Sequence, residues 1–115
     1  MNVLVKILLS SVAVIIASYL LPGVLVDGFL TAVVLAVILS LLNVTVKPLL
    51  IILTIPMTVF TFGLFLLVIN AVIILIASAL VPGFEVANFW WALIFSLLLS
   101  LLNSLLSDLN RQDQK

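Results

Sequence analysis

The sequence predicts an all-α integral membrane protein. It is a four-helix bundle of two repeated helical hairpins, with a short interfacial or re-entrant helix before the third membrane span. The 115 residues are 67% hydrophobic and 7% charged, whereas a soluble domain of this size carries about a quarter charged residues. The apolar residues come in runs of roughly twenty, the length that crosses a hydrocarbon core of about 30 Å as a helix. The second half of the chain also repeats much of the first. We expect residues 1–115 to form a single transmembrane domain.

Proline delimits the first two predicted spans. The first runs over residues 3–21 and ends at Pro22-Gly23, and the second runs over 29–46 and ends at Lys47-Pro48. Proline lacks a backbone donor and glycine accepts turn dihedrals, so both residue types are typical of helix ends.

The region between the second and fourth spans is one apolar stretch, residues 49–81, which is too long for a single untilted span. Pro56 and Gly63 interrupt it, and nearby threonines are suited to satisfying backbone groups that a break leaves free. We expect a short helix at 49–59 followed by the third span at 60–81. A single long, kinked helix is the alternative.

The fourth predicted span covers residues 89–107, before a polar tail, and it completes an internal repeat. Residues 12–43 align with 72–103 at an offset of sixty, with fifteen identities in thirty-two positions. Shared leucines do not explain the alignment of Pro-Gly, Phe, Ser and Asn. Each unit holds two spans, so both units enter the membrane in the same direction, about an axis along the membrane normal.

The charges predict an orientation. With four spans, both ends of the chain lie on one side of the membrane. All basic residues fall on that same side, namely Lys6, Lys47, Arg111 and Lys115. The hairpin tips carry only Asp27 and Glu85. The positive-inside rule then places both termini in the cytoplasm of a multi-pass protein.

Small and polar residues recur along the spans. Small residues at every fourth position allow helices to approach closely, and amides form hydrogen bonds between helices. Packing is the favoured interpretation of these stripes and a lumen is the alternative. We expect Asn43 and Asn103, at equivalent repeat positions, to form hydrogen bonds across helices, one option being a bond to each other. Asn70 lies deeper, and for it a role in permeation is the alternative to structural bonding. The expected packing and hydrogen-bonding residues are Ala32, Ala36, Ser40, Asn43, Asn70, Ala92, Ser96, Ser100 and Asn103.

Other residues are expected to anchor the helices at the membrane surface. Lys6 lies about one turn inside its span, from where its side chain can reach the interface. Tryptophans at a hairpin tip are typical of an aromatic belt. The predicted anchors are Lys6, Lys47, Trp90 and Trp91.

Several function classes are disfavoured. The chain has no cysteine and no histidine, so thiolate chemistry and the usual zinc sites are excluded. The spans contain no central ionisable residue for a proton relay. The net charge of zero predicts no pull toward nucleic acid. We therefore expect no enzymatic activity, no cofactor and no metal.

The motifs of residues 41–103 resemble those of the four-span phage holin superfamily IV, small proteins of the bacterial inner membrane. The matching features, in chain order, are Asn43 before Lys47-Pro48, Leu53-Thr54-x-Pro56, Gly63-Leu64-Phe65, Ile69-Asn70-Ala71, Val81-Pro82-Gly83-Phe84 and Phe89-Trp90. The resemblance implies a cytoplasmic-membrane protein with four spans that self-associates and modulates membrane permeability. The narrow Ala/Ser stripes disfavour a large aqueous lesion. The alternative is a non-conducting envelope protein that binds a partner membrane protein or a lipid.

Overall fold

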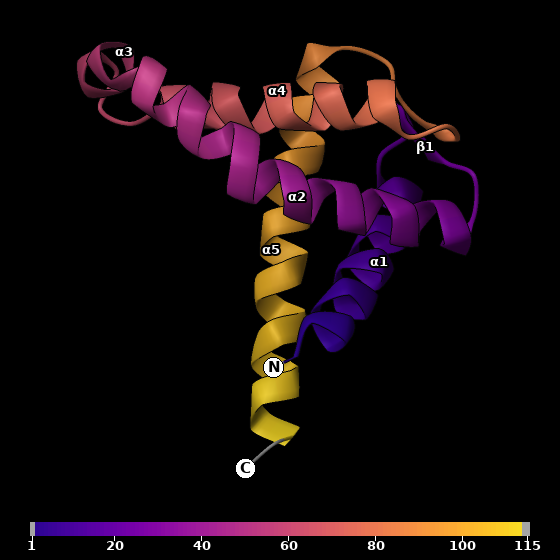
Figure 1. The fold of residues 1–115 in the computed structure, drawn as a ribbon. Helices are drawn as coiled ribbons and strands as arrows, with labels where there is room; N and C mark the ends of the chain where they lie inside the picture. The colour runs from indigo at the N-terminus through magenta and orange to yellow at the C-terminus, as the bar shows by residue number, and fades with distance from the viewer. Residues whose placement is uncertain (1, 114–115) are drawn as a thin grey trace.

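A computed structural model describes residues 2–113, which are mostly helical. Five helices and two short strands follow one another along these residues (Figure 1). In chain order they are α1 (Val3–Leu20), β1 (Val24–Val26), α2 (Phe29–Leu53), α3 (Ile55–Phe60), α4 (Phe65–Leu80), β2 (Phe84–Val86) and α5 (Phe89–Asp113).

The helix ends follow local chemistry. The side chain of Asn2 caps α1 by accepting a hydrogen bond from the Val5 N–H at 2.8 Å, and Asn88 accepts from the Trp91 N–H at 3.1 Å at the start of α5. Such side chains satisfy donors that a helix N-terminus leaves free. Helices α1 and α4 both end two positions before the proline of a Pro-Gly pair.

The second helix is longer than the sequence predicts. Helix α2 continues past the expected boundary at Lys47-Pro48 and ends at Leu53, with Pro48 inside it. A proline removes one backbone donor, which membrane helices tolerate where the freed groups are satisfied locally. The helix stops instead at Thr54, whose hydroxyl donates to the Leu50 carbonyl at 2.7 Å.

The segment after α2 is broken in two places. The short helix lies at Ile55–Phe60 rather than at 49–59, and α4 begins at Phe65 rather than at residue 60. Between them the backbone turns through positive φ at Phe62 (56°) and Gly63 (88°). Because this turn separates α3 from α4, the alternative of one continuous kinked helix is wrong.

The two Pro-Gly connections form strands, which the all-α prediction omits. Strands β1 and β2 pair antiparallel, with Leu25 opposite Glu85. Two further bonds of 2.9 Å flank the pair, from the Asp27 N–H to the Gly83 carbonyl and from the Ala87 N–H to the Gly23 carbonyl. These bonds tie together the two connections, which lie sixty residues apart.

Around the bundle, α1 and α4 each pack against both α2 and α5. The helices diverge away from the strands into two arms (Figure 1). One arm contains α2 and α4 side by side, with α3 at its far end, and the other contains α1 and α5. The tightest core lies near the strands, where Phe84 and Phe95 pack with ring centroids 5.5 Å apart and are at most 1% exposed.

Among residues 2–113, three helical segments are long and apolar enough to cross a membrane: Val3–Leu20, Phe29–Leu53 and Phe89–Leu109. Helix α4 is also apolar but shorter, with 16 residues.

Candidate functional site

The largest concentration of polar side chains inside the bundle lies where the two arms separate. Two adjoining pockets meet there, one of about 90 Å³ between α2, α4 and α5, and one of about 190 Å³ between α1, α2 and α5. Four residues line both of them, Leu39, Asn43, Leu99 and Asn103, so the two pockets share walls and together make up one recessed space. We call this space the polar hollow, and its polar lining residues are Lys6, Ser10, Ser40, Asn43, Lys47, Asn70, Ser96, Ser100 and Asn103.

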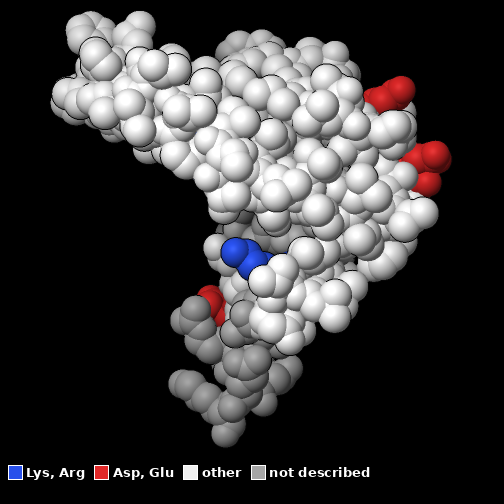
Figure 2. Space-filling view, in the orientation of Figure 1, with Lys and Arg blue, Asp and Glu red and all other residues white. Residues whose placement is uncertain are grey.

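The space-filling view shows the same feature from outside. The surface is hollowed between the two arms, with lysine atoms in the recess and one acidic side chain below it, while the other acidic side chains lie at the opposite, strand end (Figure 2). The acids of the strand end are Asp27, next to β1, and Glu85, in β2, and the third described acid, Asp108, lies on α5. The basic end predicted from the sequence also included Lys115 and the side chain of Arg111, which lie outside the described residues.

The stripe on α2 changes character along its length. Ala32 and Ala36 are buried, whereas Ser40 and Asn43 are exposed to the hollow. The hydroxyl of Ser40 donates to the Ala36 carbonyl of its own helix at 2.9 Å. The stripe therefore passes from the closed part of the bundle into the open part.

The stripe on α5 follows the same course. Ala92 and Ser96 are buried, Ser100 is exposed and Asn103 is half-buried. The Ser96 hydroxyl donates to the Leu93 carbonyl at 2.8 Å, again within its helix. Along both helices, the small residues nearest the strands are enclosed and the polar ones farther away line the hollow.

One side-chain hydrogen bond crosses between helices in the hollow. The Ser10 hydroxyl on α1 donates to the Asn103 side-chain oxygen on α5 at 3.3 Å. Asn43 lines the same two pockets as Asn103, but the bond that Asn103 accepts comes from Ser10. Asn70, on α4, is half-buried and lines the smaller pocket.

The sequence analysis did not identify Ser10 as a site residue and treated the two lysines only as surface anchors. A signal for their position exists in the spacing. Lys6 and Ser10 on α1, and Asn43 and Lys47 on α2, are four residues apart, and residues so spaced lie on the same face of a helix. Each lysine therefore lies on the same helix face as a polar residue that lines the hollow.

The two tryptophans expected to act together differ in environment. Trp90 is 67% exposed. Trp91 is half-buried and its indole lies over Gly23, where an added Cβ would collide with the ring. Trp91 therefore takes part in the packing of the strand end, and Trp90 extends from the molecule.

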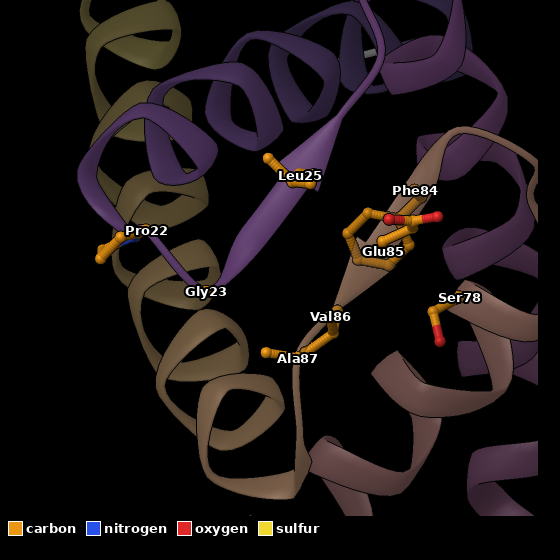
Figure 3. A pocket seen from close by; sticks show the side chains of 8 residues that line it. All are labelled: Pro22, Gly23, Leu25, Ser78, Phe84, Glu85, Val86 and Ala87. Atoms are coloured by element: carbon orange, nitrogen blue, oxygen red, sulfur yellow. The ribbon is translucent and has the colours of Figure 1, made fainter.

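A second concave surface lies beside the strands (Figure 3). This pocket of about 430 Å³ lies between the strand pair and α4, with Leu25, Ser78 and Glu85 in its walls. The Ser78 hydroxyl donates to the Leu75 carbonyl at 2.8 Å, so its proton is directed into its own helix. In the described part of the chain, no three His, Cys, Asp or Glu side chains gather where they would hold a metal ion.

Comparison with known proteins identifies the family. The family model described as mycobacterial 4 TMS phage holin, superfamily IV, matches residues 1–105. "Uncharacterized membrane protein YvlD" of Bacillus subtilis (strain 168) is 37% identical over 103 residues, which cover 89% of this chain and 87% of the relative. "Uncharacterized protein SCO3922" of Streptomyces coelicolor is 36% identical over 121 aligned residues, which cover 93% and 97%. No solved structure matches the chain. The chain therefore belongs to the four-transmembrane-segment phage holin superfamily IV, a family of membrane proteins.

Proposed function

We propose that the protein is a holin-like component of the bacterial inner membrane that self-associates and modulates membrane permeability. The observation that carries this proposal is the polar hollow, because amide and hydroxyl groups at membrane depth are costly unless they bond to protein or to water. Exposed Ser40, Asn43 and Ser100 leave the hollow open to water in the single chain. Family membership supports the same function.

The proposed bilayer arrangement has four crossings, made by two duplicated hairpins that enter in the same direction. The strand end faces outward, and the hollow and both termini face the cytoplasm. The hydrogen bonds from Asp27 to Gly83 and from Ala87 to Gly23 support this arrangement, because the repeat offset of sixty carries Asp27 onto Ala87 and Gly23 onto Gly83 and so converts one bond into the other. Helix α4, with 16 residues, spans about 24 Å, so we expect local thinning of the bilayer around it.

A single copy does not provide a continuous aqueous path. Between the hollow and the strands the bundle is closed by side chains that are at most 1% exposed, among them Leu35, Phe84 and Phe95. Water entering the hollow therefore meets an apolar plug. We infer that permeability arises when copies associate and the helices rearrange, giving small lesions rather than a wide channel.

Release of a self-quenching dye from liposomes tests this function. The full chain should release dye above a protein-free control, with a steep dependence on protein density because copies must associate. Replacing both hollow amides, Asn43→Leu with Asn103→Leu, should lower release several-fold because the apolar side chains exclude water. Thr45→Val is the matched control, since Thr45 bonds to the Leu41 carbonyl of its own helix and does not line either pocket.

Two results would reject the proposal. One is no release above the control at any density, and the other is equal release by the double-leucine variant and the natural chain. In cells, co-expression with a cytosolic endolysin should give abrupt lysis, and viable cells with a normal membrane potential would count against the proposal.

The exposed aromatic residues at the strand end favour a second candidate, a non-conducting envelope protein that binds a partner membrane protein. Trp90 is 67% exposed and Tyr19 is 86% exposed. On this account Trp90→Ala abolishes cross-linking to that partner, whereas Leu101→Ala, an exposed apolar change on the same helix, does not. Cross-linking that is equal in both variants would refute the site.

A further inference from the structure

The two lysines of the described chain line the two halves of the polar hollow. Lys6 lines the larger pocket and Lys47 the smaller one. The residues lining these pockets include no acid, and Asp108, the described acid on the same arm, is not among them. The hollow therefore gathers positive charge that its own walls do not neutralise.

The other polar groups of the hollow suit the same kind of ligand. Asn43, Asn70 and Asn103 carry amide groups with two N–H donors each, and all three line the smaller pocket beside Lys47. Ammonium and amide donors that converge on one space bind phosphate oxygens well, because bonds to a charged acceptor are about twice as strong as neutral ones. Basic pockets between transmembrane helices bind anionic lipid head groups in this way.

The walls also indicate how the ligand is presented. Val44 lines the larger pocket and is 70% exposed, so the polar space continues directly onto an apolar helix surface. A phosphate that enters here with acyl chains attached finds apolar contact for those chains. A free phosphate ion gains nothing from that surface.

We propose that the polar hollow binds the phosphate head group of an anionic phospholipid, with Lys6 and Lys47 supplying the charge and the asparagine amides supplying hydrogen bonds. This inference rests on the proposed bilayer arrangement, in which the hollow opens at the cytoplasmic leaflet. It does not depend on dye release or on self-association. The lipid neutralises the lysines and occupies the space that water otherwise fills.

Native mass spectrometry of the purified full chain in detergent tests the site. The probes are phosphatidylglycerol and phosphatidylcholine with identical acyl chains. Each lysine near a lipid surface contributes about a five-fold change in affinity, so Lys6→Gln or Lys47→Gln should each lower the preference for phosphatidylglycerol about five-fold, and the pair about thirty-fold. The double variant Lys6→Arg with Lys47→Arg keeps both charges and should retain the preference for phosphatidylglycerol. Circular dichroism verifies that all variants are helical.

Three outcomes would overturn the inference. The first is equal binding of the two lipids by the natural chain, and the second is an unchanged preference when Lys6→Gln and Lys47→Gln are combined. The third is displacement of the lipid by inorganic phosphate at an equal concentration, which would assign the hollow to a soluble anion. Dye release is measured on the same preparation. A chain that releases dye without lipid preference refutes only this inference, and a chain with the preference but no release refutes only the permeability function.

Discussion

Gly23 shows how a single missing side chain shapes the strand end. The indole of Trp91 covers Gly23 at the position a Cβ would occupy. Gly83, at the equivalent point of the other connection, has φ of 89° and lies against Asp27 and Thr31. Close packing at both Pro-Gly connections therefore requires the glycine of each pair.

We expect Gly23→Ala to lower the free energy of unfolding by about 1–3 kcal/mol, the usual cost of overpacking. Unfolding in detergent measures this cost. Trp91→Ala removes the atoms that collide with the new methyl group, so Gly23→Ala should cost much less in that background. The same cost in both backgrounds would contradict the contact.

The polar residues show what could be predicted about the candidate site. The stripe residues and Asn70 follow from spacing and residue type alone, and seven of the nine line the hollow. Ser10 as the partner of Asn103 could not be predicted, because that bond depends on where α1 crosses α5, 93 residues away in sequence. The spacing of four residues places Lys6 on the face of Ser10 and Lys47 on the face of Asn43, but that this shared face lines a hollow depends on how the helices pack.

At the scale of elements, the segment between α2 and α4 depends on its turn. Gly63 has φ of 88° and open space where a Cβ would lie, so the cost of a side chain there is purely conformational. Thr61 supports the turn by donating to the Met57 carbonyl at 3.0 Å and accepting from the Phe65 N–H at 3.1 Å. This turn allows α4 to run back beside α2.

Gly63→Ala should therefore destabilise the protein by about 1–2 kcal/mol, the cost of the left-handed region for a residue with a Cβ. Gly63→Asn should cost less, because asparagine tolerates this region better than most residues. Unfolding in detergent compares the two variants. If alanine were no worse than asparagine, the turn would not have the described backbone.

The element boundaries were predictable only where the signal is local. Proline followed by glycine ends α1 and α4 as expected, because both residues disfavour a further helical turn. The boundary predicted at Pro48 was wrong, because a helix in lipid tolerates one lost donor, and α2 ends at Leu53 instead. Strands β1 and β2 were missed because each has three residues and is stabilised by a partner sixty positions away.

At the scale of the whole molecule, the acidic strand end and the lysine-lined hollow lie at opposite ends (Figure 2). The bundle is closed near the strands and open between the arms. The proposed functions both depend on this polarity. In the proposed arrangement, the open end faces the cytoplasm and admits water or a lipid head group, and the closed end faces outward and keeps a single copy impermeable.

Cysteine labelling tests the proposed membrane arrangement most directly, because the natural chain contains no cysteine. Single cysteines at the strand end, Asp27→Cys and Glu85→Cys, should both react with a membrane-impermeant maleimide in cells with a permeabilised outer barrier and an intact inner membrane. Asn2→Cys should react only after the inner membrane is opened. Labelling of Asp27→Cys and Glu85→Cys from opposite sides of the membrane, or of Asn2→Cys from outside, would contradict four crossings by two hairpins of the same direction.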